Sequence, residues 1–316
     1  MKHPWIYLLV LLLLAGCTSR SDKLNEMLSL RYTEIDSAVS RLESMLNSDQ
    51  ITNATRIFAY SNKLETQKPE YAELIQNLRK NGESKGPMFQ SLVDRYEQFK
   101  KMPGDSEEQL ELKYIESSNL LEALNPPIFN DALSDTVNVL ADISEGTLPR
   151  VNSISKDEES LSNKSQDYGA GGQYIGNPHY GQWRTGSNGF SFWEWYGMYA
   201  LFDNLTGGRR HYYHDWSRTR PYSYYHDYGR YRYTSPSNYK KQTQLETRTK
   251  KTFQSQGKKF NSPYAKQRVG ASQLSKTSKT RPSSGSFRKA SSYRNSASST
   301  TRRANSRTSR GPGRGK

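Results

Sequence analysis

Cysteine is nearly absent from this 316-residue sequence, which contains only Cys17. One thiol cannot form an intramolecular disulfide, so the fold must rest on packing and polar contacts. Long apolar runs are missing as well. The longest, residues 5–14, is about half as long as the roughly 20 residues that a helix needs to cross a bilayer. These shortages exclude a disulfide-stapled scaffold and a membrane span within that run.

Recognisable catalytic patterns are also lacking. No Ser/His/Asp, Cys/His or paired-carboxylate arrangement stands out on a segment that the sequence predicts to fold. The glycines of residues 169–172 do not complete a dinucleotide fingerprint, because Tyr174 occupies its third position, and residues 311–316 lack the spacing of a P-loop. We therefore expect a protein that is not an enzyme and that carries no cofactor.

The N-terminus has the arrangement of a secretory signal. Lys2 provides a basic start, the apolar run follows, and the small residues Ala15 and Gly16 precede Cys17. The tetrapeptide Leu14-Ala15-Gly16-Cys17 resembles the lipobox of bacterial lipoproteins. This resemblance implies that residues 1–16 are removed and that Cys17 becomes an acylated N-terminus. The alternative is an ordinary signal peptide or a buried helix with a chance cysteine.

Acylation of Cys17 would attach the chain to a bilayer, since each buried methylene contributes about 0.8 kcal/mol and more than one chain gives a stable anchor. In Gram-negative lipoproteins of this kind, Asp after the cysteine favours the inner membrane, whereas this sequence has Thr18. The resemblance therefore implies an outer-membrane lipoprotein that faces the periplasm. We expect residues 17–23 to form a tether between the lipid and the first folded element.

Charge divides the chain into an acidic front and a basic back. Residues 17–168 carry 26 Asp and Glu against 17 Lys and Arg, whereas residues 169–316 carry 28 Lys and Arg against five Asp and Glu. This contrast predicts parts with separate partners, or parts that attract each other.

Six apolar stripes at helical spacing cover the front, and they begin near residues 28, 51, 71, 89, 110 and 129. Ser106 and Gln109 have the spacing of a reciprocal helix cap, and Asn125-Pro126-Pro127 ends the fifth stripe. We predict an all-α fold with a periplasmic bundle of five to six helices over residues 24–150, followed by a linker over 151–167. In the alternative interpretation, the first stripe forms a coiled coil with a second copy or with another envelope protein.

Residues 168–235 form a segment rich in Tyr, Trp and Gly. Ser191 and Glu194 have capping-box spacing, which predicts one apolar helix near residues 191–205. Such a helix either packs on the bundle or lies in a bilayer interface or against a partner. The aromatic residues that would face the membrane or partner are Phe192, Trp193, Trp195, Tyr196, Tyr199 and Phe202.

A short repeat follows, in which the Tyr-Tyr-His-Asp of residues 212–215 returns at residues 224–227. His211, His214 and His226 are candidate ligands for Zn²⁺ or Cu²⁺. However, no cysteine ligand is available and the surroundings are of low complexity, so we expect no metal. The alternative is a polar aromatic segment whose rings stack on one another, on sugars or on arginine.

The last 81 residues, 236–316, contain 21 Lys and Arg and a single acidic residue, Glu246. This composition predicts a disordered tail. Behind a lipoprotein signal, its partners would be anionic envelope polymer or lipid headgroups, and nucleic acid only if the protein is displayed outward. The polyanion-binding candidates are Arg302, Arg303, Arg307, Arg310 and Arg314. In the alternatives, the helical bundle docks a protein partner and the tail is incidental, or the tail only aids solubility.

Overall fold

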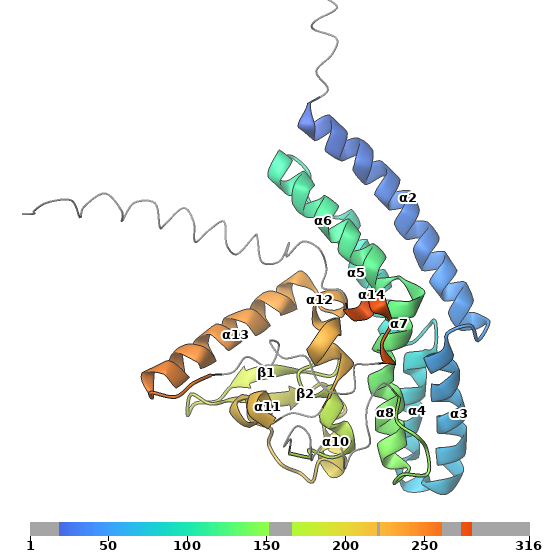
Figure 1. Cartoon of the computed structure of the whole chain (residues 1–316), viewed down its shortest axis with the longest axis vertical. Coiled ribbons are helices and arrows are strands. Elements are labelled where there is room, and N and C mark those ends of the chain that lie inside the picture. The colour runs from blue at the N-terminus through green and yellow to red at the C-terminus, as the bar shows by residue number, and fades with distance from the viewer. Residues whose placement is uncertain (1–18, 152–165, 220–221, 261–272, 280–316) are drawn as a thin grey trace, which may run out of the picture. The chain divides into compact units, whose positions relative to one another are not determined.

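Helices make up most of the structure, as the all-α prediction requires, and one small sheet accompanies them (Figure 1). The computed structural model describes residues 19–151, 166–219, 222–260 and 273–279. The lipobox of residues 14–17 and the five arginines predicted to bind polyanion lie outside these ranges. The described residues from Ser19 to Lys279 belong to one compact unit.

Helix α2 (Arg20–Asn47) begins earlier than the sequence pattern indicates. Its cap is reciprocal: the Asp22 amide donates to the Ser19 hydroxyl and the Ser19 amide donates to the Asp22 carboxylate, both at 3.1 Å. The expectation of a tether over residues 17–23 is therefore wrong from Arg20 onward. The predicted stripe does face the core, and the buried residues of α2 are Leu24, Leu28, Ile35, Ala38, Leu42 and Leu46.

Seven α-helices lie between Ser19 and Val151, one more than predicted, because the sixth stripe divides at Leu133. After α2 they are α3 (Thr52–Gln67), α4 (Ala72–Arg79), α5 (Pro87–Lys100), α6 (Glu107–Ala123), α7 (Pro126–Ala132) and α8 (Ser134–Ile143), with short 3-10 turns η1 (Pro69–Tyr71) and η2 (Lys80–Gly82). The predicted cap of α6 is formed in part: the Gln109 amide donates to the Ser106 hydroxyl at 3.3 Å, but the Gln109 side chain accepts from the Asp105 amide at 2.8 Å. Pro126, which was predicted only to end the preceding stripe, also begins α7.

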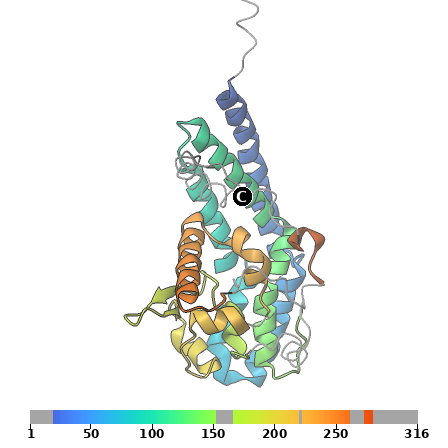
Figure 2. The same ribbon diagram turned by 60° about the vertical axis from the view of Figure 1, so that its left-hand side comes forward.

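Helix α6 lies along α2 with the same direction, as Figures 1 and 2 both show. Arg20 pairs with Glu107 and Glu111 near the start of both helices, and Arg31 donates to the Tyr114 hydroxyl at 3.2 Å further along. Because the starts of the two helices are adjacent, the loop that precedes α6 lies at the N-terminal end of α2.

The predicted apolar helix near residues 191–205 is wrong in its first half. Residues there form a hairpin, in which β1 (Gly181–Thr185) pairs antiparallel with β2 (Ser191–Trp195) and Trp183 stands opposite Trp193. Glu194 does not cap a helix. Its carboxylate accepts hydrogen bonds from Arg184 at 2.6 Å and Gln182 at 2.7 Å across the hairpin. Only α10 (Tyr199–Leu205) is helical.

The prediction of disorder over residues 236–316 is wrong for its first twenty residues, which form α13 (Pro236–Ser255). Ser235 caps this helix by accepting from the Asn238 amide at 3.3 Å, and Pro236 fits its first turn. Four side chains bury one face of the helix, namely Tyr239, Gln242, Leu245 and Phe253. The remaining elements are η3 (Ala170–Tyr174), α11 (Tyr213–Thr219), the π-helical turn η4 (Tyr225–Gly229), α12 (Arg230–Tyr233) and α14 (Lys276–Lys279).

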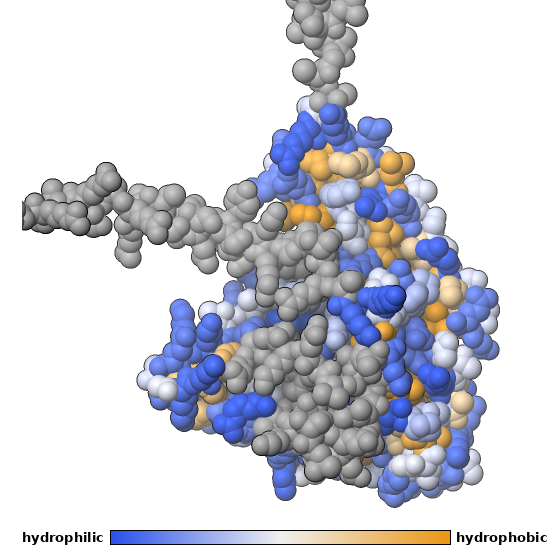
Figure 3. Space-filling view, in the orientation of Figure 1, coloured by the Kyte–Doolittle hydropathy of each residue, from blue (hydrophilic) through white to orange (hydrophobic). Residues whose placement is uncertain are grey.

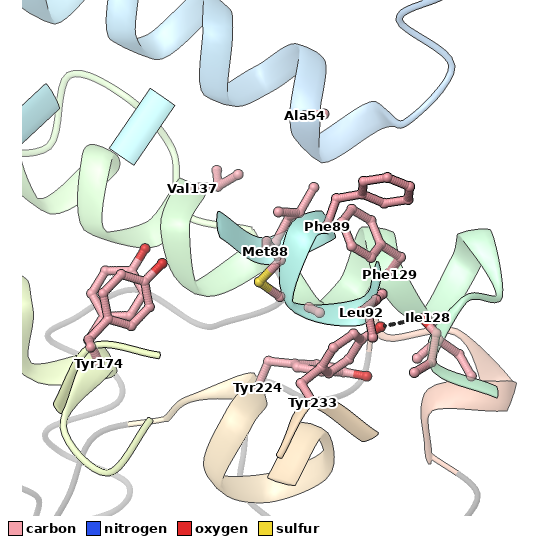
Figure 4. Close-up of a cluster of buried hydrophobic side chains, with 14 of the residues drawn as sticks. Ala54, Met88, Phe89, Leu92, Ile128, Phe129, Val137, Tyr174, Tyr224 and Tyr233 are labelled. Atoms are coloured by element: carbon pink, nitrogen blue, oxygen red, sulfur yellow. Dashed lines mark hydrogen bonds between the residues drawn. The ribbon is translucent and has the colours of Figure 1, made fainter. Parts of the chain in front are cut away.

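The aromatic segment shares its core with the helices of the front. Figure 4 shows Tyr224 and Tyr233 beside Phe129 and Leu92, and Tyr174 on the side of Val137. The Tyr233 hydroxyl donates to the Ala123 carbonyl at 3.0 Å. A large apolar area is thus buried between segments that are distant in the sequence, and this burial stabilises both.

Buried polar groups also join the two segments. The Asp135 carboxylate, at the start of α8, accepts from the Ser223 hydroxyl at 2.8 Å and from the amides of Tyr224 and Tyr225 at 2.8 and 3.2 Å. Burial raises the pKa of Asp135 to about 7, although these three donors oppose the shift. A carboxylate of the front is therefore held by neutral donors of the aromatic segment.

Arginine 95 of α5 forms a second buried junction. Its guanidinium makes two hydrogen bonds to the Glu116 carboxylate of α6, at 2.6 and 3.0 Å, and it also donates to the Arg232 carbonyl of α12. Arg232 in turn pairs with Glu122 at 2.8 Å. These contacts connect α5, α6 and α12 through charges that lie out of water.

Candidate anion-binding site

A cleft of about 930 Å³ lies between the hairpin and α13. The loop that joins the two strands forms one wall, residues 212–215 at the start of α11 form the floor, and one face of α13 forms the other wall. The hairpin lies beside α13 in both ribbon views (Figures 1 and 2). The site therefore exists because two elements that the sequence pattern did not reveal, a hairpin and a helix, face each other.

Three cations line this cleft, namely Arg248, Lys251 and Lys258. Arg248 and Lys251 lie three residues apart on α13, so they project from neighbouring positions of the helix. Lys258 follows the end of the helix, where its amide donates to the Phe253 carbonyl at 2.8 Å. Within the described ranges, none of the three forms an ion pair, whereas the lining contains one carboxylate, Asp215. The cleft therefore attracts anions.

Aromatic rings accompany the cations. Phe190 at the tip of the hairpin is 55% exposed, an unusual position for a large apolar side chain. Phe253 of α13 packs on His214 with ring centroids 4.6 Å apart. Beside the cleft, the Arg210 guanidinium lies over the Phe192 ring at 4.6 Å from its centroid. Rings and cations together are suited to an anionic ligand that also has apolar or ring faces.

Desolvation lowers the pKa of His214, and the positive charges of Arg218 and Lys258 lower it further, while Asp215 opposes the shift. The imidazole is therefore neutral at pH 7. His214 then provides a hydrogen-bonding ring in the cleft, and the positive charge comes from the three cations.

The three candidate metal ligands lie against different aromatic rings. His211 meets Tyr168 edge-on at 5.1 Å, and His226 meets Trp216 at 4.5 Å. Burial lowers the pKa of His211 to about 4. In the part of the chain that the structure describes, no group of three His, Cys, Asp or Glu side chains is placed to hold a metal ion. The positions of His211 and His226 therefore agree with the interpretation in which rings of this segment pack on one another.

The aromatic residues predicted to face a membrane or a partner divide into two groups. Trp193, Trp195 and Phe202 are buried, and Trp195 stacks on Phe202 at 4.6 Å between centroids, so these three face the interior of the protein. Phe192 is half-buried, and Tyr196 is 44% exposed. The side chain of Tyr199 lies outside the described residues. These three rings therefore pack inside the protein and do not face a membrane or a partner.

Sequence reasoning missed the cleft because it assigned α13 to a disordered tail. The available signals were the Ser235-Pro236 start and a run of twenty residues, 237–256, without Gly or Pro. Asn188-Gly189 was the corresponding signal for the hairpin. Lys and Arg on α13 were counted toward the net charge, but their placement on a formed helix was not anticipated.

Comparisons with protein-family models, with curated proteins and with solved structures returned no match to this chain. Among the described helices, none is both long and apolar enough to cross a bilayer.

Proposed function

We propose that this protein is a non-enzymatic lipoprotein of the cell envelope that binds anionic envelope polymer through its cationic C-terminal region. The observation that supports this most is the cleft beside α13, whose three cations lack carboxylate partners among the described residues. Cations that are not neutralised within the protein remain available to an external polyanion. Residues 280–316, with their high content of Lys and Arg, would extend the contact along the polymer.

The lipobox supports the location. Acylation of Cys17 would hold the protein on a bilayer, and Thr18 favours the outer membrane with the protein facing the periplasm. The accessible polyanions there are lipopolysaccharide phosphates, anionic headgroups and the carboxylates of peptidoglycan. Nucleic acid would be a partner only for a protein displayed on the cell surface.

Binding of the mature protein to lipopolysaccharide, measured as a function of salt, tests the proposal. Affinity should fall log-linearly with salt concentration, because each phosphate that is neutralised releases counterions. The triple variant Arg248→Gln, Lys251→Gln and Lys258→Gln should bind at least about tenfold more weakly than the unmodified protein and should show a flatter salt slope.

A matched control separates the cleft from net charge. Lys240, Lys250 and Lys259 are exposed and do not line the cleft, so their replacement by Gln removes the same charge from elsewhere. We expect this control to lose clearly less affinity than the cleft variant. Binding that is insensitive to salt, or equal small losses in both variants, would contradict the proposal.

A second candidate function is the docking of a partner protein. Figure 3 shows hydrophobic surface along the pair α2 and α6, and the exposed large apolar side chains of these helices are Met27, Leu30 and Leu112. Leu30 is 62% exposed. Cross-linking in cells from a photoreactive residue at Leu30 would trap such a partner. A partner that is still trapped after residues 280–316 are deleted would favour this function over polymer binding.

A further inference from the structure

A smaller hollow of about 220 Å³ adjoins the cleft and differs from it chemically. The two share Thr185, Leu245 and Arg248, so one ligand could occupy both. The hollow lies between the hairpin and the N-terminal half of α13. Its volume is about a quarter of that of the cleft, so it would hold a small part of a ligand that extends into the cleft.

Aromatic side chains form one side of the hollow. Trp183 is half-buried and meets Trp193 edge-on, with centroids 5.2 Å apart at an angle of 70°. Tyr196 extends this side and is also exposed. Tyr213 and Trp216 also pack on Trp183, with ring centroids 4.8 and 5.1 Å away, so neighbouring rings hold Trp183 in position. The hollow thus has a firm aromatic wall.

Amides and cations form the opposite side. Asn238 and Gln244 of α13 line the hollow, and Gln182 lines it from β1. Lys241 and Arg248 lie seven residues apart on the same face of α13, and neither forms an ion pair among the described residues. No Asp or Glu lines the hollow. Amides suit hydroxyl groups and cations suit carboxylates, and the two cations are about 10 Å apart along the helix axis.

We infer that the hollow binds one acidic sugar residue of an envelope glycan. The apolar face of the sugar ring packs on Trp183, its hydroxyl groups bond to the amides, and its carboxylate pairs with Lys241. Neighbouring residues of the glycan continue into the larger cleft past Arg248. The inference rests on the proposed function and narrows it, because it names carboxylated sugars as the units of the polymer that the protein recognises.

A single-stranded nucleic acid also combines rings with negative charge. The sugar is favoured because the side chains of Asn238 and Gln244 and the side-chain oxygen of Gln182 can bond to its hydroxyl groups. A simple anion would not use the aromatic wall, and a lipid chain would not use the amides.

The test is titration of the mature protein with a galacturonic acid hexasaccharide, followed through the indole N–H signals in ¹H–¹⁵N spectra. Cleavage after residue 16 leaves four tryptophans, which Trp→Phe variants assign. The signals of Trp183 and Trp193 should shift more than those of Trp195 and Trp216, which contact these two rings but do not line the hollow. A neutral hexasaccharide of N-acetylglucosamine should bind at least about tenfold more weakly.

Charge variants complete the test. Lys241→Gln should weaken binding of the acidic hexasaccharide at least about tenfold, whereas Lys240→Gln, on the exposed side of the same helix, should change it less than about twofold. Equal binding of acidic and neutral sugars, shifts of all four indoles alike, or tighter binding of oligothymidylate would overturn the inference. If lipopolysaccharide still binds with a steep salt dependence in those cases, the proposed function stands and only this assignment fails.

Discussion

Replacement of Glu116 by Gln should destabilise the protein more than almost any other isosteric change. Arg95 and Glu116 are each only 5% exposed, and their two hydrogen bonds of 2.6 and 3.0 Å hold the charges in register. A Gln side chain accepts one of these bonds and turns an amide N–H₂ toward the other guanidinium nitrogen. The positive charge of Arg95 then stays buried without a counter-charge, which costs about 3–5 kcal/mol.

Such a loss is a large share of the 5–15 kcal/mol by which domains are typically stable. Urea unfolding of the mature protein, followed by circular dichroism and by tryptophan fluorescence, would measure it. Because Arg95 also donates to the Arg232 carbonyl, both signals should report the same loss: α5 and the aromatic segment are held by the same guanidinium.

Two further variants separate this effect from the loss of any ion pair. Glu97→Gln removes the carboxylate of the exposed Lys100–Glu97 pair, in which the two charged atoms are 2.7 Å apart, and should destabilise the protein far less than Glu116→Gln does. The double variant Arg95→Met and Glu116→Leu removes both charges and should regain most of the stability lost in Glu116→Gln. A Glu116→Gln protein as stable as Glu97→Gln would refute the reasoning, since it would mean that water reaches the guanidinium.

Four other outcomes are expected. Asp135 has a pKa of about 7 in the folded protein against an ordinary 3.8, so it binds its proton more tightly when folded, and the free energy of unfolding should fall by at most about 4 kcal/mol as pH rises from about 4 to 7. The difference between the urea midpoints at pH 5 and pH 8 should therefore be smaller in Asp135→Asn than in the unmodified protein. An unchanged difference would contradict the assignment. Gly181→Ala brings a Cβ to 2.4 Å from the Glu194 carbonyl oxygen and should cost about 1–3 kcal/mol, whereas Gly186→Ala meets only the end of the Asn188 side chain and should cost less in the same unfolding assay. Cys17→Ser should abolish labelling by a palmitate analogue, and full labelling of that variant would disprove the anchor. Simultaneous replacement of Arg302, Arg303, Arg307, Arg310 and Arg314 by Gln should weaken binding to lipopolysaccharide and flatten its salt slope; unchanged binding would show that these arginines are incidental.

Local signals made much of the front predictable. The apolar stripe of α2 faces the core as its spacing requires, Ser106 caps α6, and the break at residues 125–127 ends the helix before it. Each of these features depends on residues within one or two helical turns of each other. The fold class could be predicted for the same reason.

The hairpin escaped prediction because its composition is uniformly aromatic. Phe192, Trp193 and Trp195 give an apolar pattern in which positions on both strand faces look alike, so a helical period fits as well as an alternating one. What decides the structure is the partner strand, where Trp183 lies against Trp193. That contact is absent from any local window of the sequence.

The cleft escaped prediction because it depends on three segments that are distant in the sequence. Phe190, His214 and Arg248 meet only after the hairpin, α11 and α13 have packed together. The composition predicted that the C-terminal region binds anions, but it also predicted that the whole region is a disordered tail. For α13 that was wrong, because Tyr239, Leu245 and Phe253 give one face of a strongly basic helix enough apolar surface to pack.

The reciprocal cap at Ser19 limits the length of chain between the lipid anchor that we propose on Cys17 and the first helix, α2. Three residues, 17–19, span at most about 10 Å when extended, so an acyl group on Cys17 would leave almost no slack before helix α2 begins. The 28 residues of that helix then rise about 42 Å. The loop that precedes α6 lies at the N-terminal end of α2, where Arg20 pairs with Glu107. An acyl group on Cys17 would therefore hold this loop, together with the start of α2, next to the bilayer.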